Sequence, residues 1–152
     1  QNPGGLLSSV IDVASYLVPS GQTIVIMEDR NGDRKVSRSN PFTPKYTFEK
    51  IIVLVDGGTA SAAEILAGAL QDNKLATLVG QTTFGKGIVQ TITPLSQGSA
   101  VILTTARYLT PSGRSIHKIG ITPDIEVVTT SQDLEQGKDP VFDKAVEILS
   151  GS

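Results

Sequence analysis

A short apolar segment that runs through a glycine turn into an alanine-rich stretch constrains the fold more than any other feature. Residues 51–55 are apolar on both faces, which is typical of a central strand that is covered on both sides. Residues 56–59 include two adjacent glycines, and residues 60–70 consist mainly of strong helix formers. A strand, a tight turn and a helix in this order place the turn at the carboxyl edge of a sheet, where open α/β folds bind ligands. The sequence therefore predicts an α/β domain with a functional site at this turn.

The rest of the chain alternates between helical and extended patterns. Apolar residues recur every three or four positions over residues 6–18, which predicts a helix. The Asn31-Gly32 pair tolerates the positive φ angles of a tight hairpin turn between two strands at 23–27 and 35–38. Together these patterns predict an α/β fold with one mixed sheet flanked by helices. Further strands are expected at residues 76–79, 88–92, 100–105 and 125–128.

A polar stretch near the C-terminus divides the chain into two parts. Residues 129–138 are polar and predict a linker, and Pro140 is a suitable first-turn residue for a final helix. We therefore expect the core to span residues 1–128, and the linker and C-terminal helix to span residues 129–152. The chain opens on Gln1 rather than on methionine, and we expect it to be a fragment of a longer protein.

The composition excludes several kinds of chemistry. The 152 residues include no cysteine, so the chain has no disulfide, no thiolate metal site and no cysteine nucleophile. A single histidine disfavours a zinc site of the usual multi-histidine kind, and we expect neither a metal nor another cofactor. A net charge of −2 gives no basic footprint, so we expect no nucleic-acid partner.

Ser61 follows the glycine turn and allows two interpretations. In the functional one, Ser61 lies at the sheet edge among small neighbours, which let a substrate backbone approach closely. In the structural one, Ser61 and Glu64 form a capping box, in which the two side chains satisfy free amides of the first helical turn. The segment by itself favours the cap.

Lys86 differs from the other lysines because it lies among glycines and apolar residues. The GxxxxGK pattern that ends at Lys86 resembles part of a phosphate-binding loop, but Gly87 stands where a Mg²⁺-binding hydroxyl is needed, and a strand pattern follows. A surface lysine in a turn is the structural alternative. A neutral lysine amine can serve as the base for a serine nucleophile, and we expect burial among Gly85, Gly87, Phe84 and residues of the sheet to favour that neutral form.

Ser61 and Lys86 together form a candidate catalytic pair. The backbone amides of Gly4 or Gly5 and of Ala62, each near a helix N-terminus, are placed to form an oxyanion hole for acyl transfer. This arrangement predicts nucleophilic catalysis without histidine.

His117 offers an alternative, a Ser-His-Asp triad with Ser61 and one of three aspartates. The histidine lies in a polar stretch between expected strands, so we expect it to be an exposed loop residue. The three aspartates are Asp56, Asp72 and Asp124.

Five blocks of sequence occur in an order that resembles the carboxyl-terminal processing proteases, also called tail-specific proteases. The resemblance covers nearly the whole chain up to residue 125. The blocks read NPGG at 2–5, GTASAAEI at 58–65, ALQD at 69–72, TFGKGIVQ at 83–90, and LTTARY at 103–108 continuing to PSGRSI at 111–116.

The resemblance implies a core similar to the crotonase and Clp protease fold, and a serine endopeptidase that acts near the carboxyl termini of proteins. It assigns Ser61 as the nucleophile, Lys86 as the general base and Gln90 as the residue that orients the lysine. Even spacing on a strand would put Lys86 and Gln90 on one face. Asp72 lies in a matching block, and we interpret it as a structural residue at a helix end.

The resemblance also implies partners and a location. We expect protein or peptide substrates with apolar C-terminal tails, a PDZ domain elsewhere in the full-length protein, and a periplasmic or otherwise extracytoplasmic location, with a membrane anchor and a homo-oligomer left open. Two positions depart from the usual pattern: Ala63 stands where many members have serine, and His117 where many have glutamine. The alternative function is a catalytically inactive fragment that serves as an interaction or assembly domain.

Overall fold

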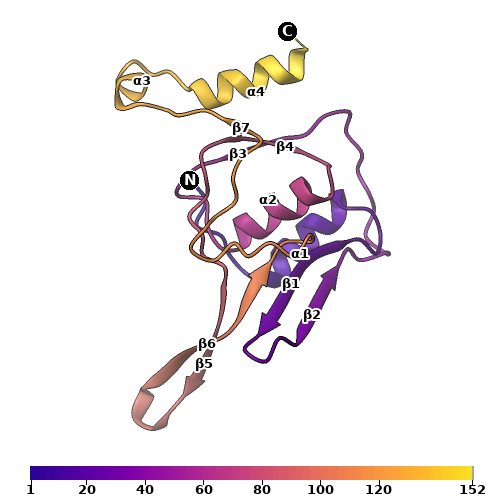
Figure 1. Cartoon of the computed structure of the whole chain (residues 1–152), viewed down its shortest axis with the longest axis vertical. Helices are drawn as coiled ribbons and strands as arrows, with labels where there is room; N and C mark the ends of the chain where they lie inside the picture. Colours follow the sequence, from indigo (N-terminus) through magenta and orange to yellow (C-terminus); the bar gives the residue numbers. More distant parts are fainter. Residues whose placement is uncertain (152) are drawn as a thin grey trace.

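The strands of the computed structural model, which describes residues 1–151, form two separate sheets (Figure 1). The α/β class is confirmed, and the expected single sheet is wrong. β7 occupies the edge of β4 that faces away from β3, so no edge of β4 is left for the antiparallel strands. One sheet is antiparallel, in the order β2-β1-β6-β5, with β1 (Thr23–Asp29), β2 (Arg34–Arg38), β5 (Ile88–Pro94) and β6 (Ala100–Leu109). The other is parallel, in the order β3-β4-β7, with β3 (Ile52–Val55), β4 (Thr77–Gly80) and β7 (Ile125–Glu126).

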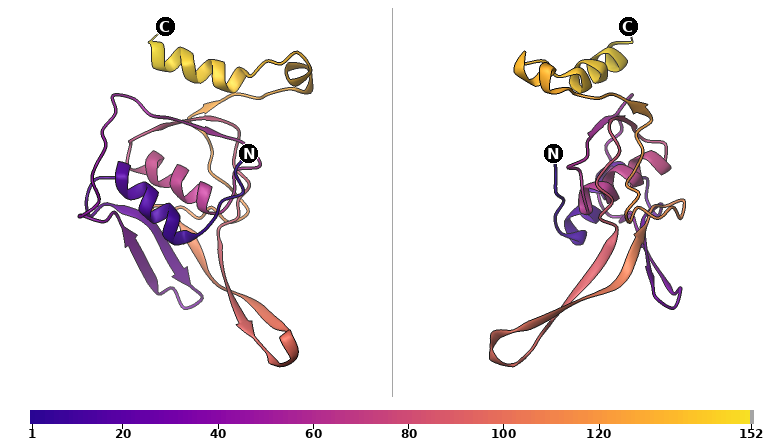
Figure 2. Two further views of the ribbon diagram at one scale, coloured as in Figure 1. Left: turned by 180° about the vertical axis from the view of Figure 1, so that it is seen from behind. Right: turned by 60° about the vertical axis from the view of Figure 1, so that its left-hand side comes forward.

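Two helices lie side by side between these sheets, and both were expected from the sequence (Figure 2). α1 (Leu7–Leu17) contacts α2 (Ala62–Asp72), and α2 also contacts β1 and β4. Burying one large aliphatic side chain contributes roughly 1.5–3 kcal/mol, so this shared core supplies most of the packing free energy. Its fully buried members include Ala14, Val18, Ile24, Val25, Leu70, Leu78 and Ile121.

β3 is less covered than its apolar sequence predicts. Leu54 is 44% exposed, and β3 is an edge strand of its sheet. Helix α4 (Pro140–Ser150) contacts β3 and β4 on the face away from α2 (Figure 1). The expectation of a strand buried on both faces is wrong, because α4 covers the second face only in part.

Part of the expected linker is helical. α3 (Ser131–Glu135) begins after Thr130, whose Oγ1 accepts a hydrogen bond from the N–H of Asp133 at 3.2 Å. Asp133 returns the bond, since its Oδ2 accepts from the N–H of Thr130 at 2.9 Å. This reciprocal cap stabilises a short helix that its polar composition alone did not indicate. Among residues 1–151, no helix combines the length and the apolar composition needed to cross a membrane.

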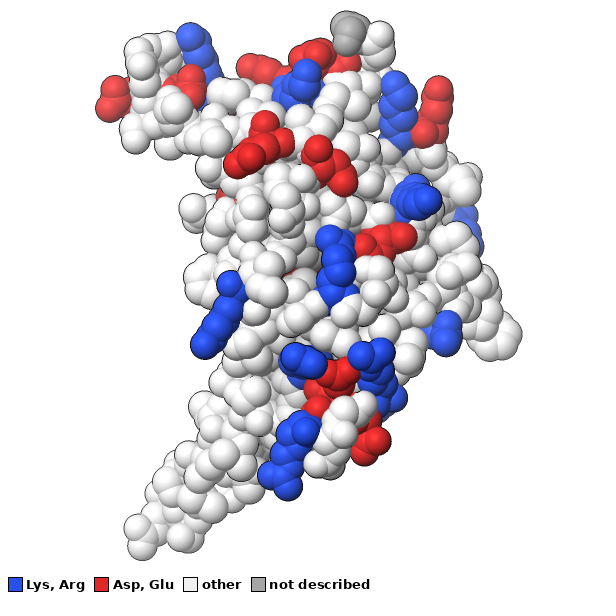
Figure 3. Space-filling view, viewed as in Figure 1, with Lys and Arg blue, Asp and Glu red and all other residues white. Residues whose placement is uncertain are grey.

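β5 and β6 form a hairpin that projects from the rest of the protein, with a 3₁₀ turn (Ser96–Gly98) at its tip (Figure 1). Residues 87–106 contain no charged side chain, and the hairpin accordingly shows neither acidic nor basic groups in Figure 3. β5 is also an edge strand, so one side of its backbone has no strand partner. The large apolar side chains of the projecting part of the hairpin are mostly exposed, among them Ile92, Leu95, Ile102 and Leu103.

Candidate active site

Ser61 lies between β3 and α2 in a backbone conformation that is rare for a residue with a side chain. Its φ is 57° and its ψ is −122°. A sharp turn from a strand into a helix exposes the nucleophilic hydroxyl in many serine hydrolases, and such a conformation costs on the order of 1–3 kcal/mol. Hydrogen bonds hold it here: the N–H of Ser61 donates to Oε2 of Glu64 at 2.8 Å, and its carbonyl accepts from the N–H of Glu64 at 2.9 Å. We call residues 59–62 the serine turn.

The two interpretations of Ser61 prove to be compatible. Ser61 and Glu64 have the arrangement of the predicted capping box, and the Glu64 half of it is a well-formed hydrogen bond. The Ser61 side chain makes no capping hydrogen bond of normal geometry. The hydroxyl oxygen therefore lies in the capping position, while the hydroxyl proton has no acceptor among residues 1–151.

The N-terminal residues lie directly against the serine turn. The N–H of Ala60 donates to the carbonyl oxygen of Asn2 at 2.9 Å. A Cβ on Gly4, whose φ is +94°, would lie 2.5 Å from the carbonyl oxygen of Ala60 and 2.8 Å from the nitrogen of Ala62, so this position requires glycine. The N–H of Gly4 donates to Oδ1 of Asn2 at 3.0 Å. Within residues 1–151, no hydrogen bond engages the N–H of Gly5 or that of Ala62.

The residues around Lys86, 83–87, belong to the irregular segment between β4 and β5, and we call them the lysine turn. A Cβ on Gly87 would lie 2.6 Å from the nitrogen of His117, so the lysine turn can approach residues 116–120 only because glycine stands there. The carbonyl of Gly85 accepts from the N–H of Lys118 at 2.8 Å. The two turns are joined directly, because the N–H of Phe84 donates to the carbonyl of Thr59 at 2.9 Å.

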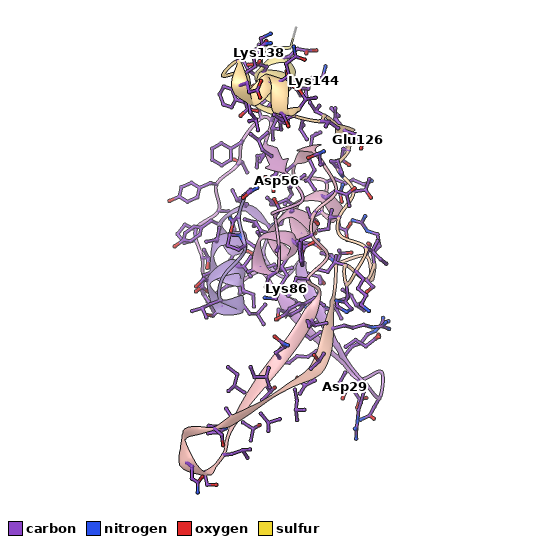
Figure 4. The ribbon with its side chains drawn as sticks, turned by 90° about the vertical axis from the view of Figure 1, so that its left-hand side faces the viewer. Asp29, Asp56, Lys86, Glu126, Lys138 and Lys144 are labelled. Atoms are coloured by element: carbon purple, nitrogen blue, oxygen red, sulfur yellow. The ribbon has the colours of Figure 1, made fainter. Side chains whose placement is uncertain are left out.

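Lys86 itself is exposed at the foot of the β5–β6 hairpin (Figure 4). The expected burial of its side chain is wrong: two of the three neighbours that were to cover it are glycines, and the third, Phe84, is 66% exposed. Within residues 1–151, the side chains of Ser61 and Lys86 are not hydrogen-bonded to each other. The structure thus brings the two turns together through their backbones.

One carboxylate connects the serine turn with the lysine turn. Glu64 has no exposed surface, and its Oε2 accepts from the N–H of Ser61 and from the N–H of Lys86, each at 2.8 Å. Its Oε1 accepts from the N–H of Gly85 at 2.7 Å and from Oγ1 of Thr83 at 2.5 Å. From the sequence, Glu64 was interpreted only as a cap, and Thr83 was not singled out.

Two comparisons with known proteins bear on this site. Residues 1–127 match the sequence model of peptidase family S41. This chain belongs to that family. It is 44% identical over 155 residues to a carboxyl-terminal-processing protease of Synechocystis sp., across 99% of this chain and 35% of that protein. It is 48% identical over 139 residues to a carboxy-terminal-processing protease of Bartonella bacilliformis, across 91% of this chain and 32% of that protein.

The fold of this S41 chain agrees with solved structures. The photosystem II D1 C-terminal processing protease superposes with a TM-score of 0.75 at 44% identity, over 84% of this chain and 32% of that one. The chain thus has the Clp-protease-like α/β core that the resemblance implies. It spans about a third of the length of the relatives it matches.

Asp72 ties the C-terminal end of α2 to the loop after β6 in this S41 chain. Its Oδ2 accepts from the N–H of Ser112 at 2.8 Å, and its Oδ1 lies 2.5 Å from Nη2 of Arg114. Partial burial acts to raise the pKa of Asp72, but hydrogen bonds from Thr110 and Ser112 and the charge of Arg114 outweigh it and hold that pKa below its ordinary value. The same loop continues to residues 116–120 against the lysine turn, so Asp72 supports the site from a distance.

The remaining candidates lie beside the lysine turn. Gln90 is an exposed residue on β5, whereas Lys86 precedes that strand, so strand alternation alone does not place their side chains on one face. His117 is partly buried rather than exposed, because its backbone packs on Gly87. Its Nδ1 is buried without a hydrogen-bond partner among residues 1–151, so it does not form the alternative triad.

Proposed function

We propose that the protein containing this chain is a serine endopeptidase that cleaves proteins near their carboxyl termini, with Ser61 as the nucleophile and Lys86 as the general base. The observation that carries the proposal is the shared anchoring of the two residues: the backbone N–H groups of Ser61 and Lys86 donate to the same oxygen of Glu64. The positive φ of Ser61 and a hydroxyl proton that has no acceptor among residues 1–151 support its role. The matching family and the printed names of the relatives support the reaction class.

In the proposed reaction, Ser61 Oγ attacks the carbonyl carbon of the scissile peptide while its proton passes to Nζ of Lys86. The tetrahedral intermediate expels the amine, which takes the proton from Lys86, and leaves an acyl group on Ser61. Water then attacks this ester, with Lys86 accepting and returning its proton, and releases the carboxylate product. Gln90 is proposed to orient the amine of Lys86 between these transfers.

The oxyanion hole is proposed to use the amides of Gly5 and Ala62. Both N–H groups are free of other hydrogen bonds within residues 1–151, whereas the N–H of Gly4 is held by Asn2. Gly4, the third candidate, then serves to let the N-terminal turn come within contact distance of Ala62. Preorganised donors of this kind contribute roughly 3–4 kcal/mol of transition-state stabilisation each.

A lysine acts as a base only in its neutral form, which burial favours. Because Lys86 is exposed in this chain, we propose that a bound substrate or other parts of the full-length protein cover it. Substrates with apolar carboxyl-terminal tails suit such a cover, since they remove water as they bind. We further propose a PDZ domain elsewhere in the protein and an extracytoplasmic location. Relatives named chloroplastic are consistent with a role outside the cytosol.

The test is active-site labelling of the full-length protein with a fluorophosphonate, which modifies activated serine hydroxyls. We expect Ser61→Ala to abolish labelling and hydrolysis of a protein with an apolar tail, and Lys86→Ala to lower both rates at least a hundredfold. Ser9→Ala and Lys35→Ala, at exposed positions away from both turns, are the matched controls and should behave as wild type.

Equal labelling of wild type and Ser61→Ala would disprove the nucleophile. Absence of labelling in the folded wild type would favour the alternative, a non-catalytic interaction domain. A pH–rate profile of Lys86→Ala that keeps the wild-type ascending limb, in which the rate rises as the base loses its proton, would argue against the lysine as base.

A further inference from the structure

Glu64 is fully buried, yet no basic side chain of the described residues forms an ion pair with it. Within residues 1–151, the salt bridges involve other acidic groups, and Glu64 takes part in none of them. A buried carboxylate without a counter-ion is strongly unfavourable unless several donors compensate its charge. Here the compensation comes entirely from backbone N–H groups and one hydroxyl.

The donors around Glu64 fix its role as an acceptor. Four donors converge on its two oxygens, two on each. The hydroxyl of Thr83 accepts from the N–H of Ile121 at 2.7 Å and donates to Glu64. These two bonds tie the segment at Ile121 into the same network.

Glu64 does more than an ordinary capping residue. The side chain of a glutamate in a capping box accepts a hydrogen bond from the N–H of the N-cap residue, and so satisfies one amide of its own helix. Glu64 makes that bond to Ser61 and three further bonds to the lysine turn. The backbone nitrogens of Ser61 and Lys86 therefore lie within two hydrogen-bond lengths of each other, across a separation of 25 residues in sequence.

We propose that Glu64 is a positioning residue for the Ser61–Lys86 pair, which sets the distance between nucleophile and base by holding both backbones on one oxygen. This inference rests on the proposed function. Glu64 touches neither substrate nor the reacting atoms, so its removal should slow the chemical step and leave substrate binding nearly unchanged.

The variant that tests this is Glu64→Gln in the full-length protein. A glutamine of the same shape offers one oxygen and one NH₂ group, so it can accept either from Ser61 and Lys86 or from Thr83 and Gly85. Both orientations leave at least one N–H of the lysine turn without an acceptor. We expect kcat and the rate of fluorophosphonate labelling to fall at least tenfold, with KM within threefold of wild type.

Glu28→Gln is the matched control, because Glu28 is also a mostly buried carboxylate with hydrogen-bond partners, Arg34 and Arg107, but lies on β1 and makes no hydrogen bond to either turn. The measurements are made at a temperature where circular dichroism shows all variants to be folded. We expect Glu28→Gln to keep kcat and labelling within threefold of wild type. Wild-type kcat and labelling in Glu64→Gln, or an equal loss in both variants, would overturn the proposal.

Amide hydrogen exchange in the wild-type protein gives a readout that needs neither activity nor a folded variant. If one carboxylate holds both turns, the amides of Ser61, Gly85 and Lys86 exchange through a common opening, with protection factors within tenfold of each other. Protection of Ser61 together with unprotected amides at Gly85 and Lys86 would overturn the proposal. A wild-type protein that takes no label but shows the common protection would instead refute the proposed function. The hydrogen-bonded connection of the two turns through Glu64 would still hold.

Discussion

The serine and lysine turns differ from the β5–β6 hairpin, which follows the lysine turn directly in sequence, in what holds them. Each turn is bonded to segments distant in the chain, through Glu64, through the bond from Phe84 to Thr59, and through the glycine contacts on residues 116–120. The hairpin, which begins one residue after the lysine turn, is held mainly by the pairing of its own two strands. In its projecting part, within residues 87–106, the large apolar side chains are mostly exposed and there is no charged side chain (Figure 3).

This difference shows which contacts determine the geometry of the site. Backbone hydrogen bonds to a buried carboxylate fix the two turns within the core, whatever surrounds the chain. The hairpin has an open edge and a projecting, uncharged surface, which is the kind of surface that proteins normally cover. Contacts within this chain therefore determine where the backbones of Ser61 and Lys86 lie. The surroundings of the Lys86 side chain depend instead on what lies near the foot of the hairpin (Figure 4).

The largest effect on stability is expected from Thr83→Val. Valine keeps the volume but removes the hydroxyl that donates to Glu64 and accepts from Ile121, so one buried acceptor loses a donor and one buried N–H loses its partner. We expect the free energy of unfolding, measured by urea denaturation, to fall by about 2–4 kcal/mol. The control is Thr105→Val in the hairpin, where the hydroxyl pairs with that of Thr91 in an exposed position. A similar loss in both variants would remove the contrast between the two regions.

The next largest effect is expected from Gly4→Ala, which should lower the rate of catalysis. The new Cβ would meet the carbonyl of Ala60 and the nitrogen of Ala62, and would push the N-terminal turn away from the proposed oxyanion hole. We expect kcat/KM for peptide hydrolysis to fall about a hundredfold, the cost of one misplaced oxyanion donor. Gly21→Ala has a comparable positive φ but no atom within 4 Å of the new Cβ, so it should lower stability slightly and leave kcat/KM unchanged. Full activity in Gly4→Ala would show that this contact does not shape the site.

The contrast between the two regions also explains what the sequence could predict. Local patterns predict α1, α2 and the β1–β2 hairpin, because periodicity, helix propensity and the Asn31-Gly32 turn act over short distances. The residues of the serine and lysine turns were found from glycine spacing and the resemblance. Neither could show that Glu64 bonds to residues 83–86, since that contact depends on how α2 packs. The exposure of Lys86 was missed for the same reason: apolar neighbours in sequence do not imply neighbours in space.

A smaller effect is expected at Asp72, which supports the lysine turn through the loop after β6. Asp72→Asn removes the ion pair with Arg114, and we expect a loss of about 1–2 kcal/mol in the free energy of unfolding at pH 7. Because the folded pKa of Asp72 is below its ordinary value, the stabilisation is fully present above the unfolded pKa of about 3.9 and is lost as pH falls through the folded pKa. Urea denaturation of both proteins from pH 7 to pH 3 should show a constant difference down to about pH 5, which then shrinks. A difference that grows on acidification would contradict this linkage.

The smallest effect is expected in the hairpin, from Ile92→Thr combined with Ile102→Thr. These residues face each other across β5 and β6 and are 64% and 59% exposed, and threonine keeps the β-branched shape that suits a strand. We expect the free energy of unfolding to change by less than about 0.5 kcal/mol per substitution, against about 2–4 kcal/mol for Ile24→Thr in the core, where the side chain has no exposed surface. Urea denaturation of the full-length protein makes the measurement. A loss above 1 kcal/mol per hairpin substitution would mean that the rest of the protein covers this part of the hairpin.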